Sequence, residues 1–288
     1  MYLKPQTSFL FASALASLLT FATSVEAQVI VNDSWADGSR TDGAEETDAN
    51  WWTSTSMKDA IEVSKGSLGL VSGTSGRGIR ATFEAQTLEV GDSIKVTYKF
   101  TTPATVGSDV SGGFRVGIFD KLERDGLDSD LKASSGSPNA LYDGLPGYMA
   151  DFDSNIAEGK KQDVNIRKHN LEASVGRLLG TTSGYDSLGN GGDDYEFATA
   201  NTEYTGMFSI TRTGKDTADV ASSLSQGEKV LASHTATDKS GIANNFGMLA
   251  FHATSNAFGS STTADEEDNG LSFSNVTVEI KKAEKSDK

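Results

Sequence analysis

The most regular stretch of the chain reads Ser93-Ile94-Lys95-Val96-Thr97-Tyr98-Lys99-Phe100. Apolar side chains alternate with polar ones, which is the period of a β-strand with one buried and one solvent-facing side. Similar runs recur along the chain, separated by clusters of Gly, Asn, Asp and Ser that are typical of turns. These runs are 77–83, 112–120, 147–153, 163–169, 205–212, 229–235, 246–254 and 271–280.

About ten to twelve strands at irregular spacing, without alternating helices, predict an all-β fold and an antiparallel β-sandwich. We expect one such domain over 28–280, followed by a charged tail at 281–288. In the last strand the apolar phase changes between Phe273 and Val276, which predicts a β-bulge. The glycine-rich stretch 189–192 lacks the Lys-Ser/Thr and the helix of a phosphate loop, so it is predicted to form a turn.

Residues 1–27 have the pattern of a secretory signal peptide. Lys4 precedes an apolar run, 9–22, that is too short to span a bilayer, and the segment ends on the small residue Ala27. The alternative is a first helix of the fold. We expect cleavage before Gln28, and therefore a protein secreted to the periplasm or the extracellular medium.

The amino-acid composition limits the classes of partner that the protein is expected to bind. The chain has 25 Lys and Arg against 40 Asp and Glu, for a formal net charge of −15, and no cysteine. Disulfides, thiolate metal sites and cysteine nucleophiles are therefore excluded. Nucleic acid is not an expected partner, nor is a membrane once the signal peptide is removed, because binding to nucleic acid or to anionic lipid needs a basic surface.

The strand pattern resembles the concanavalin A-like lectin and glucanase (laminin-G-like) jelly rolls of secreted bacterial proteins. The stretches that carry the resemblance are Asp33-Ser34-Trp35, Gly113–Phe119, Gly147-Tyr148, Gly247–His252 and Leu271–Ile280. The resemblance implies a jelly roll that interacts with a polysaccharide or other glycan. It does not choose an activity, because this fold hosts lectins, binding modules, hydrolases and lyases. The E-x-D-x-x-E strand of the related retaining glucanases is absent.

Candidate site residues lie at alternating positions of several predicted strands. If these strands belong to one sheet, one set of side chains converges on its open face. Either Tyr148 or Asp151 would join this set, depending on which side chains of their strand point to that face. The set is Arg115, Asn165, Arg167, His169 and His252.

Such a set suits an acidic sugar. Arg or Asn would neutralise a uronate carboxylate, His would remove the C5 proton and Tyr would protonate the leaving oxygen. Several polysaccharide lyases of this fold are built this way. The resemblance therefore implies catalytic roles for His169, His252 and Tyr148, and substrate-binding roles for the rest of the set, namely Arg115, Asn165, Arg167 and Asp151. The alternative is that Arg167 pairs with an acidic neighbour and His252 is an ordinary hydrogen-bonded residue.

Two carboxylates offer another chemistry. Asp151 and Asp153 stand at i and i+2 of one strand, about 6–7 Å apart, which is close to the spacing of a glycosidase pair. In so acidic a chain such a pair is also expected by chance.

Acidic loops offer oxygen ligands for a structural Ca²⁺. One loop carries Asp33, Asp37 and Asp42, and a second, before the last strand, carries Asp265, Glu266, Glu267 and Asp268. Neither matches the EF-hand pattern. Related sandwiches often hold Ca²⁺ where the first and last strands meet, and both loops would lie there. The alternative is that both loops are simply solvated.

The tryptophans divide between core and surface. Trp35 beside a strand is expected in the core, and the adjacent Trp51 and Trp52 point to opposite sides, so that at most one is exposed for stacking on a sugar. Together these patterns predict a secreted carbohydrate-interacting β-sandwich, acting as a glycan-binding or recognition domain. The alternatives are a polysaccharide lyase acting on an anionic glycan, favoured over a glycoside hydrolase, and an extracellular structural protein without a site.

Overall fold

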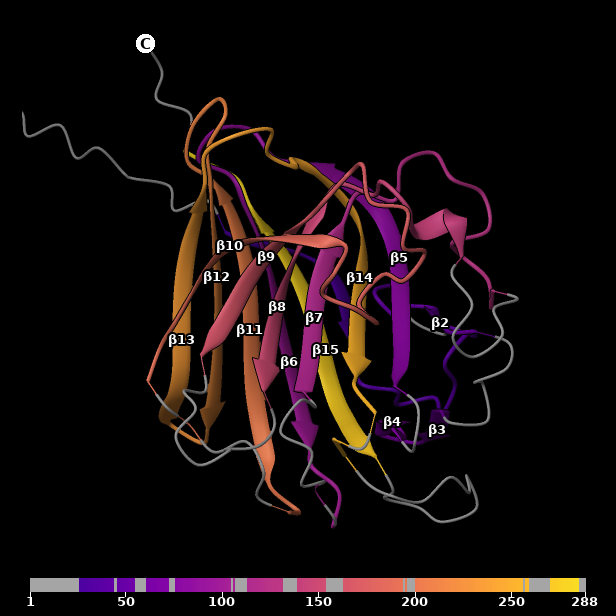
Figure 1. Cartoon of the computed structure of the whole chain (residues 1–288). Helices are drawn as coiled ribbons and strands as arrows, with labels where there is room; N and C mark the ends of the chain where they lie inside the picture. The colour runs from indigo at the N-terminus through magenta and orange to yellow at the C-terminus, as the bar shows by residue number, and fades with distance from the viewer. Residues whose placement is uncertain are drawn as a thin grey trace, which may run out of the picture.

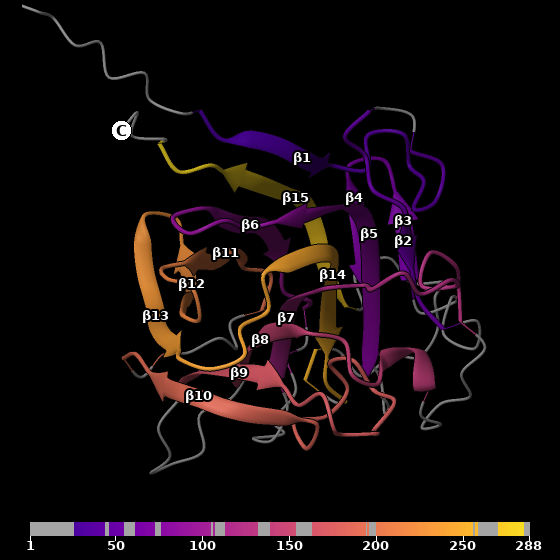
Figure 2. The same ribbon diagram turned by 90° about the horizontal axis from the view of Figure 1, so that it is seen from above.

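The protein is a sandwich of two antiparallel β-sheets (Figures 1 and 2). The computed structural model describes residues 26–43, 46–54, 61–72, 76–104, 106, 113–131, 139–153, 163–193, 195, 200–255, 257–258 and 270–284. Over these ranges every pair of neighbouring strands is antiparallel. The predicted all-β sandwich is therefore confirmed.

In the described ranges, sheet A has eight strands. They are β1 (Gln28–Asp33), β3 (Ile61–Ser64), β4 (Ser67–Leu70), β6 (Ser93–Thr101), β11 (Glu203–Arg212), β12 (Ala218–Gln226), β13 (Lys229–Asp238) and β15 (Leu271–Lys281). Their spatial order is β13-β12-β11-β6-β15-β4-β3, and β1 also pairs with β15.

Sheet B has seven strands in the part of the chain that the structure describes. They are β2 (Trp51–Trp52), β5 (Arg77–Thr87), β7 (Gly113–Phe119), β8 (Gly147–Asp153), β9 (Val164–His169), β10 (Tyr185–Gly191) and β14 (Asn245–Ala253). Their order is β10-β9-β8-β7-β14-β5-β2. A 3₁₀ turn, η2 (Ala140–Tyr142), lies between β7 and β8 in the sequence.

The strand count in the described ranges exceeds the ten to twelve expected, and one predicted turn is wrong. Residues 189–191 continue strand β10 instead of forming a turn. Their glycines make room for another strand: a Cβ on Gly191 would lie 2.7 Å from Nδ1 of His234 on β13. Figure 2 shows β13 and β10 meeting at this side of the molecule, where the two sheets come together.

The predicted bulge in the last strand is confirmed. The register of β15 against β6 shifts between Phe273 and Asn275. The shift lets both Phe273 and Val276 point into the core, where each has no exposed surface.

Aromatic rings fill the space between the sheets. Tyr98 and Phe273 come from sheet A, and Phe114 and Phe251 come from sheet B; all four are buried. Phe251 lies at the centre, with ring centroids 4.9 Å from Phe273, 5.1 Å from Tyr98 and 5.8 Å from Phe114. Because large rings carry the greatest apolar area, this cluster is a main source of attraction between the two sheets.

The two ends of the described chain lie side by side. Gln28, the first residue of β1, pairs with Ile280 near the end of β15. Residues 1–25 and 285–288 lie outside the described ranges, so signal cleavage and the charged tail stay predictions. In the part of the chain that the structure covers, no helix has the length and apolarity needed to cross a membrane.

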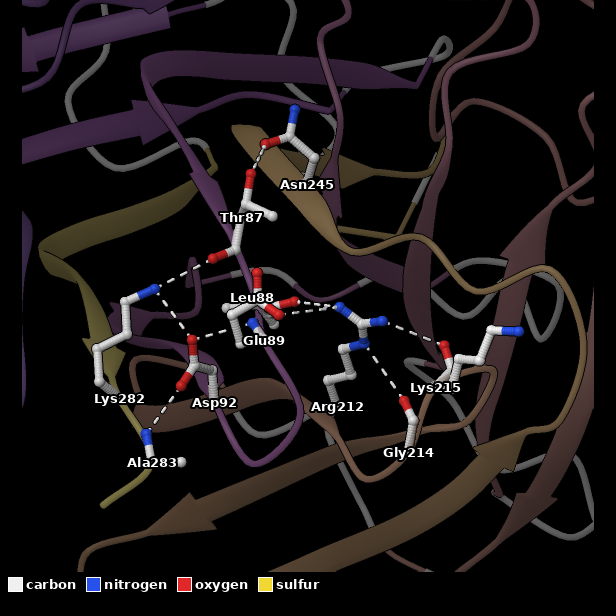
Figure 3. A network of polar contacts seen from close by, with 10 residues as sticks. All are labelled: Thr87, Leu88, Glu89, Asp92, Arg212, Gly214, Lys215, Asn245, Lys282 and Ala283. Carbon is white, nitrogen blue, oxygen red and sulfur yellow. Dashed lines mark hydrogen bonds and ion pairs between the residues drawn. The ribbon is translucent and has the colours of Figure 1, made fainter. Parts of the chain in front are cut away.

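A polar network holds the segment after β15 against the turn between β5 and β6 (Figure 3). Asp92 accepts hydrogen bonds from the backbone N–H of Ala283 at 2.8 Å and from the Lys282 ammonium at 3.0 Å. Arg212 donates to the carbonyl of Leu88 at 2.8 Å. The segment after β15 is thus held by the Asp92 side chain, and the turn that carries Asp92 is held by Arg212 of β11.

Replacing Phe251 by Ala should lower the free energy of unfolding by about 3–5 kcal/mol, because it removes a buried ring that contacts both sheets. The matched control is Val230→Ala on β13, where 58% of the residue is exposed and the change should stay within about 0.5 kcal/mol. Urea unfolding of both variants measures the difference. Equal losses would show that the ring cluster does not hold the sheets together.

Candidate functional site

Four of the predicted site residues form one row across sheet B. Arg115 on β7 pairs with Asp151 on β8 and with His252 on β14, and Asp151 pairs with Asn165 on β9. Residues directly opposite each other on antiparallel strands point to the same face. Asn165, Asp151, Arg115 and His252 are called the Arg115 row below.

The Arg115 row lies on the outer face of sheet B. The residues next to it in the sequence, among them Phe114, Phe152 and Phe251, are buried between the sheets. Because successive side chains of a strand point to opposite faces, Arg115, Asp151 and the other members of the row face away from sheet A. The expectation that these strands share one sheet is confirmed.

Arg115 is held in place by two acceptors. Its Nε donates to the Asp151 carboxylate at 3.0 Å, and its Nη1 donates to the Leu179 carbonyl at 2.8 Å. The side chains of Arg115 and Asp151 are only 11% and 9% exposed. The row therefore carries a guanidinium in a fixed position, next to a carboxylate that offsets its charge.

Part of the outer face is covered by the segment that follows β9. Leu178 and Leu179 pack with Phe119, Met149 and Met248 into a second apolar cluster on this side of the sheet. The Arg115 row borders this cluster, and its members Asn165 and His252 keep part of their surface exposed. The outer face thus has an apolar, covered part and a polar part that remains partly open.

His252 is neutral and has an unused polar atom. Burial, followed by the positive charges of Arg115 and Arg77, lowers its pKa to about 3. Its Nδ1 is buried and has no hydrogen-bond partner within the described ranges. The ring lies close to Gly76 and Gly78 of the neighbouring chain segment, where a Cβ would approach to 2.7 and 3.2 Å.

Arg167 has a second unused polar atom on the same face. It follows Asn165 by two residues on β9, so both side chains point outward. Its Nε is buried and, in the part of the chain that the structure covers, lacks a hydrogen-bond partner. No ion pair to an acidic neighbour is found for it among the described residues.

Asp153, the second member of the predicted carboxylate pair, follows Asp151 by two positions on β8 and therefore shares its face. Burial and the neighbouring Asp151 carboxylate raise its pKa to about 6, against the lowering effect of Arg115 and Arg167. Asp163, just before β9, also acts to raise it. Two carboxyl groups on one strand thus differ in environment: Asp151 is paired with a guanidinium, and Asp153 holds its proton up to mildly acidic pH.

His169 does not join the Arg115 row. It lies four residues beyond Asn165 on β9, and β9 is three strands away from β14, so His169 and His252 are about 20 Å apart. His169 is 2% exposed, and its Nδ1 lies 2.6 Å from the Leu145 carbonyl. Its pKa is lowered, chiefly by burial. The expected convergence of the two histidines is not formed.

Tyr148 lies on the opposite face of sheet B, inside the sandwich. Its hydroxyl donates to Asp238 of β13 at 2.8 Å and accepts from the Ala243 N–H at 3.0 Å. Lys168 also contacts Asp238, at 2.9 Å. Burial, followed by the Asp238 contact, raises the pKa of Tyr148. Of the two residues that strand phase left open, Asp151 joins the row, whereas Tyr148 links the two sheets.

In the described part of the N-terminal acidic loop, the carboxylate of Asp33 is occupied by N–H donors. The oxygens of Asp33 accept N–H groups of Trp35 at 2.8 Å, Ala49 at 3.3 Å and the Trp51 ring at 2.7 Å. Asp37 is exposed and accepts from the Ser39 N–H. A carboxylate surrounded by N–H donors does not fit a cation. Over the described ranges, no three His, Asp or Glu side chains are grouped as metal ligands.

The second acidic loop, with Asp265 and Asp268, lies outside the described residues, so calcium binding there stays a prediction. The tryptophans behave as expected: Trp35 and Trp51 are in the core, and Trp52 is partly exposed. Trp52 pairs with Arg80 of β5 and therefore shares the outer face with the Arg115 row.

Comparison with known proteins identifies the fold. No family model and no curated protein matches the chain in sequence. Solved structures do match it in shape. The metal-free exoplasmic/lumenal domain of VIP36 has a TM-score of 0.52 at 9% identity, covering 91% of this chain and 95% of that one.

Two further matches are similar in extent. VIP36 in its Ca²⁺/Man3GlcNAc-bound form has a TM-score of 0.51 at 10% identity, covering 87% and 91% of the two chains. The carbohydrate recognition domain of Emp46p, in a mutant form, has a TM-score of 0.50 at 10% identity, covering 87% and 94%. The protein has the concanavalin A-like lectin fold. At such low identity, the likeness concerns this lectin fold alone.

Replacing Asp153 by Asn should stabilise the protein at pH 7.5 but not near pH 4. The folded-state pKa of about 6 exceeds the ordinary value of 3.8, so the contribution of Asp153 to stability is largest below about pH 4 and is lost as the pH rises through 6. Asn carries no charge at either pH, so the variant does not lose this stability at high pH. Thermal unfolding of the wild type and the variant at both pH values measures the difference in melting temperature.

Asp151→Asn is the matched control, because it takes the charged partner from Arg115 and should lower the melting temperature at pH 7.5. A lower melting temperature for Asp153→Asn at pH 7.5 would show that the Asp153 carboxylate stabilises the fold instead.

Proposed function

We propose that the protein is a secreted glycan-binding domain whose contact surface is the Arg115 row together with Arg167. A ligand on this surface would lie across the strands of sheet B, on the face turned away from sheet A. The Arg115–Asp151 pair gives this surface a rigid centre, and Asn165 and His252 flank it.

The observation that carries the proposal is the pair of unused polar atoms on this face, Nε of Arg167 and Nδ1 of His252. A buried polar group without a hydrogen bond costs about 1–3 kcal/mol. The unused hydroxyls of Tyr98 and Tyr195, by contrast, belong to residues of the apolar core. The unused atoms of Arg167 and His252 lie instead on a polar, partly exposed surface, where the hydroxyl and ring oxygens of a sugar can pair with them.

The comparisons agree with this proposal. One matched structure is a VIP36 domain bound to Man3GlcNAc, and another is a carbohydrate recognition domain of Emp46p. The predicted signal peptide at 1–27 supports secretion, because such a leader directs a chain out of the cytoplasm.

The arrangement of residues that the lyase alternative requires is not present among the described residues. His169 and Tyr148 lie away from the Arg115 row, and the low pKa of His252 makes it a weak base. Glycoside hydrolysis has a specific observation in its favour. Asp151 is paired with Arg115, and the pKa of Asp153 is raised to about 6. Such a split between two nearby carboxyl groups is the pattern of a hydrolytic acid and its partner.

The test is binding of residues 28–288 to a glycan array, followed by calorimetry with the best ligand. Arg167→Met should weaken binding about tenfold or more, because it removes a charge-assisted hydrogen bond. Lys99→Met is the matched control: it removes an exposed cation from β6 of the other sheet and should leave the affinity unchanged.

Equal affinities for the two variants would place the contact surface elsewhere, and the absence of any bound glycan would favour a structural role. New reducing ends, released by the wild type but not by Asp153→Asn, would favour hydrolysis.

A further inference from the structure

We infer that the glycan is an acidic oligosaccharide, and that the His252 end of the Arg115 row receives its carboxylate or sulfate. The inference rests on the proposed function, because it assigns a ligand class to the same surface. It is carried by the kinds of polar atoms on this face and by how they are spaced.

The His252 end of the row is locally positive, although the chain as a whole has a net charge of −15. The charged groups that act on His252 are Arg115 on β7 and Arg77 on β5, and both are cations. An anion entering beside His252 meets the guanidinium of Arg115, and this kind of group is well suited to carboxylate and sulfate oxygens. Arg77 pairs with the core residue Ala253, so its positive charge acts on this end of the row from the inner side of the sheet.

The unused Nε of Arg167 requires an acceptor oxygen as its partner. A guanidinium nitrogen can only donate, so the partner of the Arg167 Nε must be an acceptor. A guanidinium has five N–H donors. Arg115 uses two of them: its Nε donates to Asp151, and its Nη1 donates to the Leu179 carbonyl. The remaining donors of Arg115 are available to a group with several acceptor oxygens, which an ionised acid provides and a single hydroxyl does not.

The spacing requires more than one sugar. Arg167 on β9 and His252 on β14 are separated by β8 and β7, so their backbones lie about 14 Å apart across the sheet. One sugar ring cannot reach both. The ligand is therefore a chain of sugars that crosses the strands.

The carboxyl groups on the β8 side make the binding dependent on pH. Asp153 faces Asp151 on its own strand, Arg115 on β7, Arg167 on β9 and Asp163 before β9. Near pH 6 the Asp153 carboxylate takes up a proton, because its pKa is raised to about 6. One negative charge then leaves the surface, and an acidic ligand is repelled less.

The experiment compares three probes of equal length by calorimetry: an oligogalacturonate, its carboxyl-reduced neutral counterpart and a sulfated oligogalactan. The wild type should bind at least one acidic probe about tenfold more tightly than the neutral one. Whichever acid is preferred identifies the anion as carboxylate or sulfate. The preference should weaken with added salt, and affinity for the acidic probe should increase between pH 7.5 and pH 5.5.

Two variants sharpen the result. Arg77→Met should reduce the ratio of the affinity for the acidic probe to the affinity for the neutral probe. Asp153→Asn should bind the acidic probe at pH 7.5 as tightly as the wild type does at pH 5.5. Equal binding of acidic and neutral probes would overturn the inference and leave the proposed function standing. If none of the probes and no glycan of the array binds, the proposed function itself fails.

Discussion

The packing of aromatic rings between the two sheets is the constraint on which the rest of the structure depends. Phe114 on β7 and Phe251 on β14 must point inward to meet Tyr98 and Phe273 from sheet A. Since side chains alternate along a strand, a slip of one residue would turn these rings to solvent. The core therefore fixes the register of the strands that carry the site.

The polar surface is a consequence of that register. With the rings inside, the residues next to them, Arg115 and His252, must point outward, and the pairing of the strands aligns them with Asp151 and Asn165. Desolvation and neighbouring charges then give the residues on this face different pKa shifts. His252 is kept neutral by burial and by the positive charges of Arg115 and Arg77, and Asp153 keeps its proton to about pH 6. One face of a sheet thus combines a positive end with a titratable acidic end.

Features that depend on local alternation can be predicted from the sequence. They include the strands with clear apolar periodicity, the bulge at Phe273 and the outward face shared by Asn165 and Arg167. Strand β12 escapes such a prediction because small and polar residues, such as Ser222, occupy buried positions there. Strand β10 resembles a turn in sequence because Gly191 makes room for His234, a contact that only the tertiary structure reveals.

Longer-range relationships are beyond the sequence. Whether His169 lies near His252 depends on the order of the strands in the sheet. Whether Asp33 can bind a metal depends on which N–H groups lie close enough to donate hydrogen bonds to it. The distance along β9 and across to β14 separates the histidines, and the buried donors of the N-terminal loop occupy the carboxylate. The sequence therefore predicts which side chains of one strand share a face. It does not predict which side chains of other strands lie next to them.

A ligand that contacts the outer face of sheet B is the central claim. An NMR titration that follows arginine Nε–H and histidine ring signals tests it most directly. We predict that a bound glycan shifts the signals of Arg115, Arg167 and His252, while Arg212 and His234, which lie in sheet A, stay unchanged. Shifts confined to Arg212 and His234 would contradict the claim.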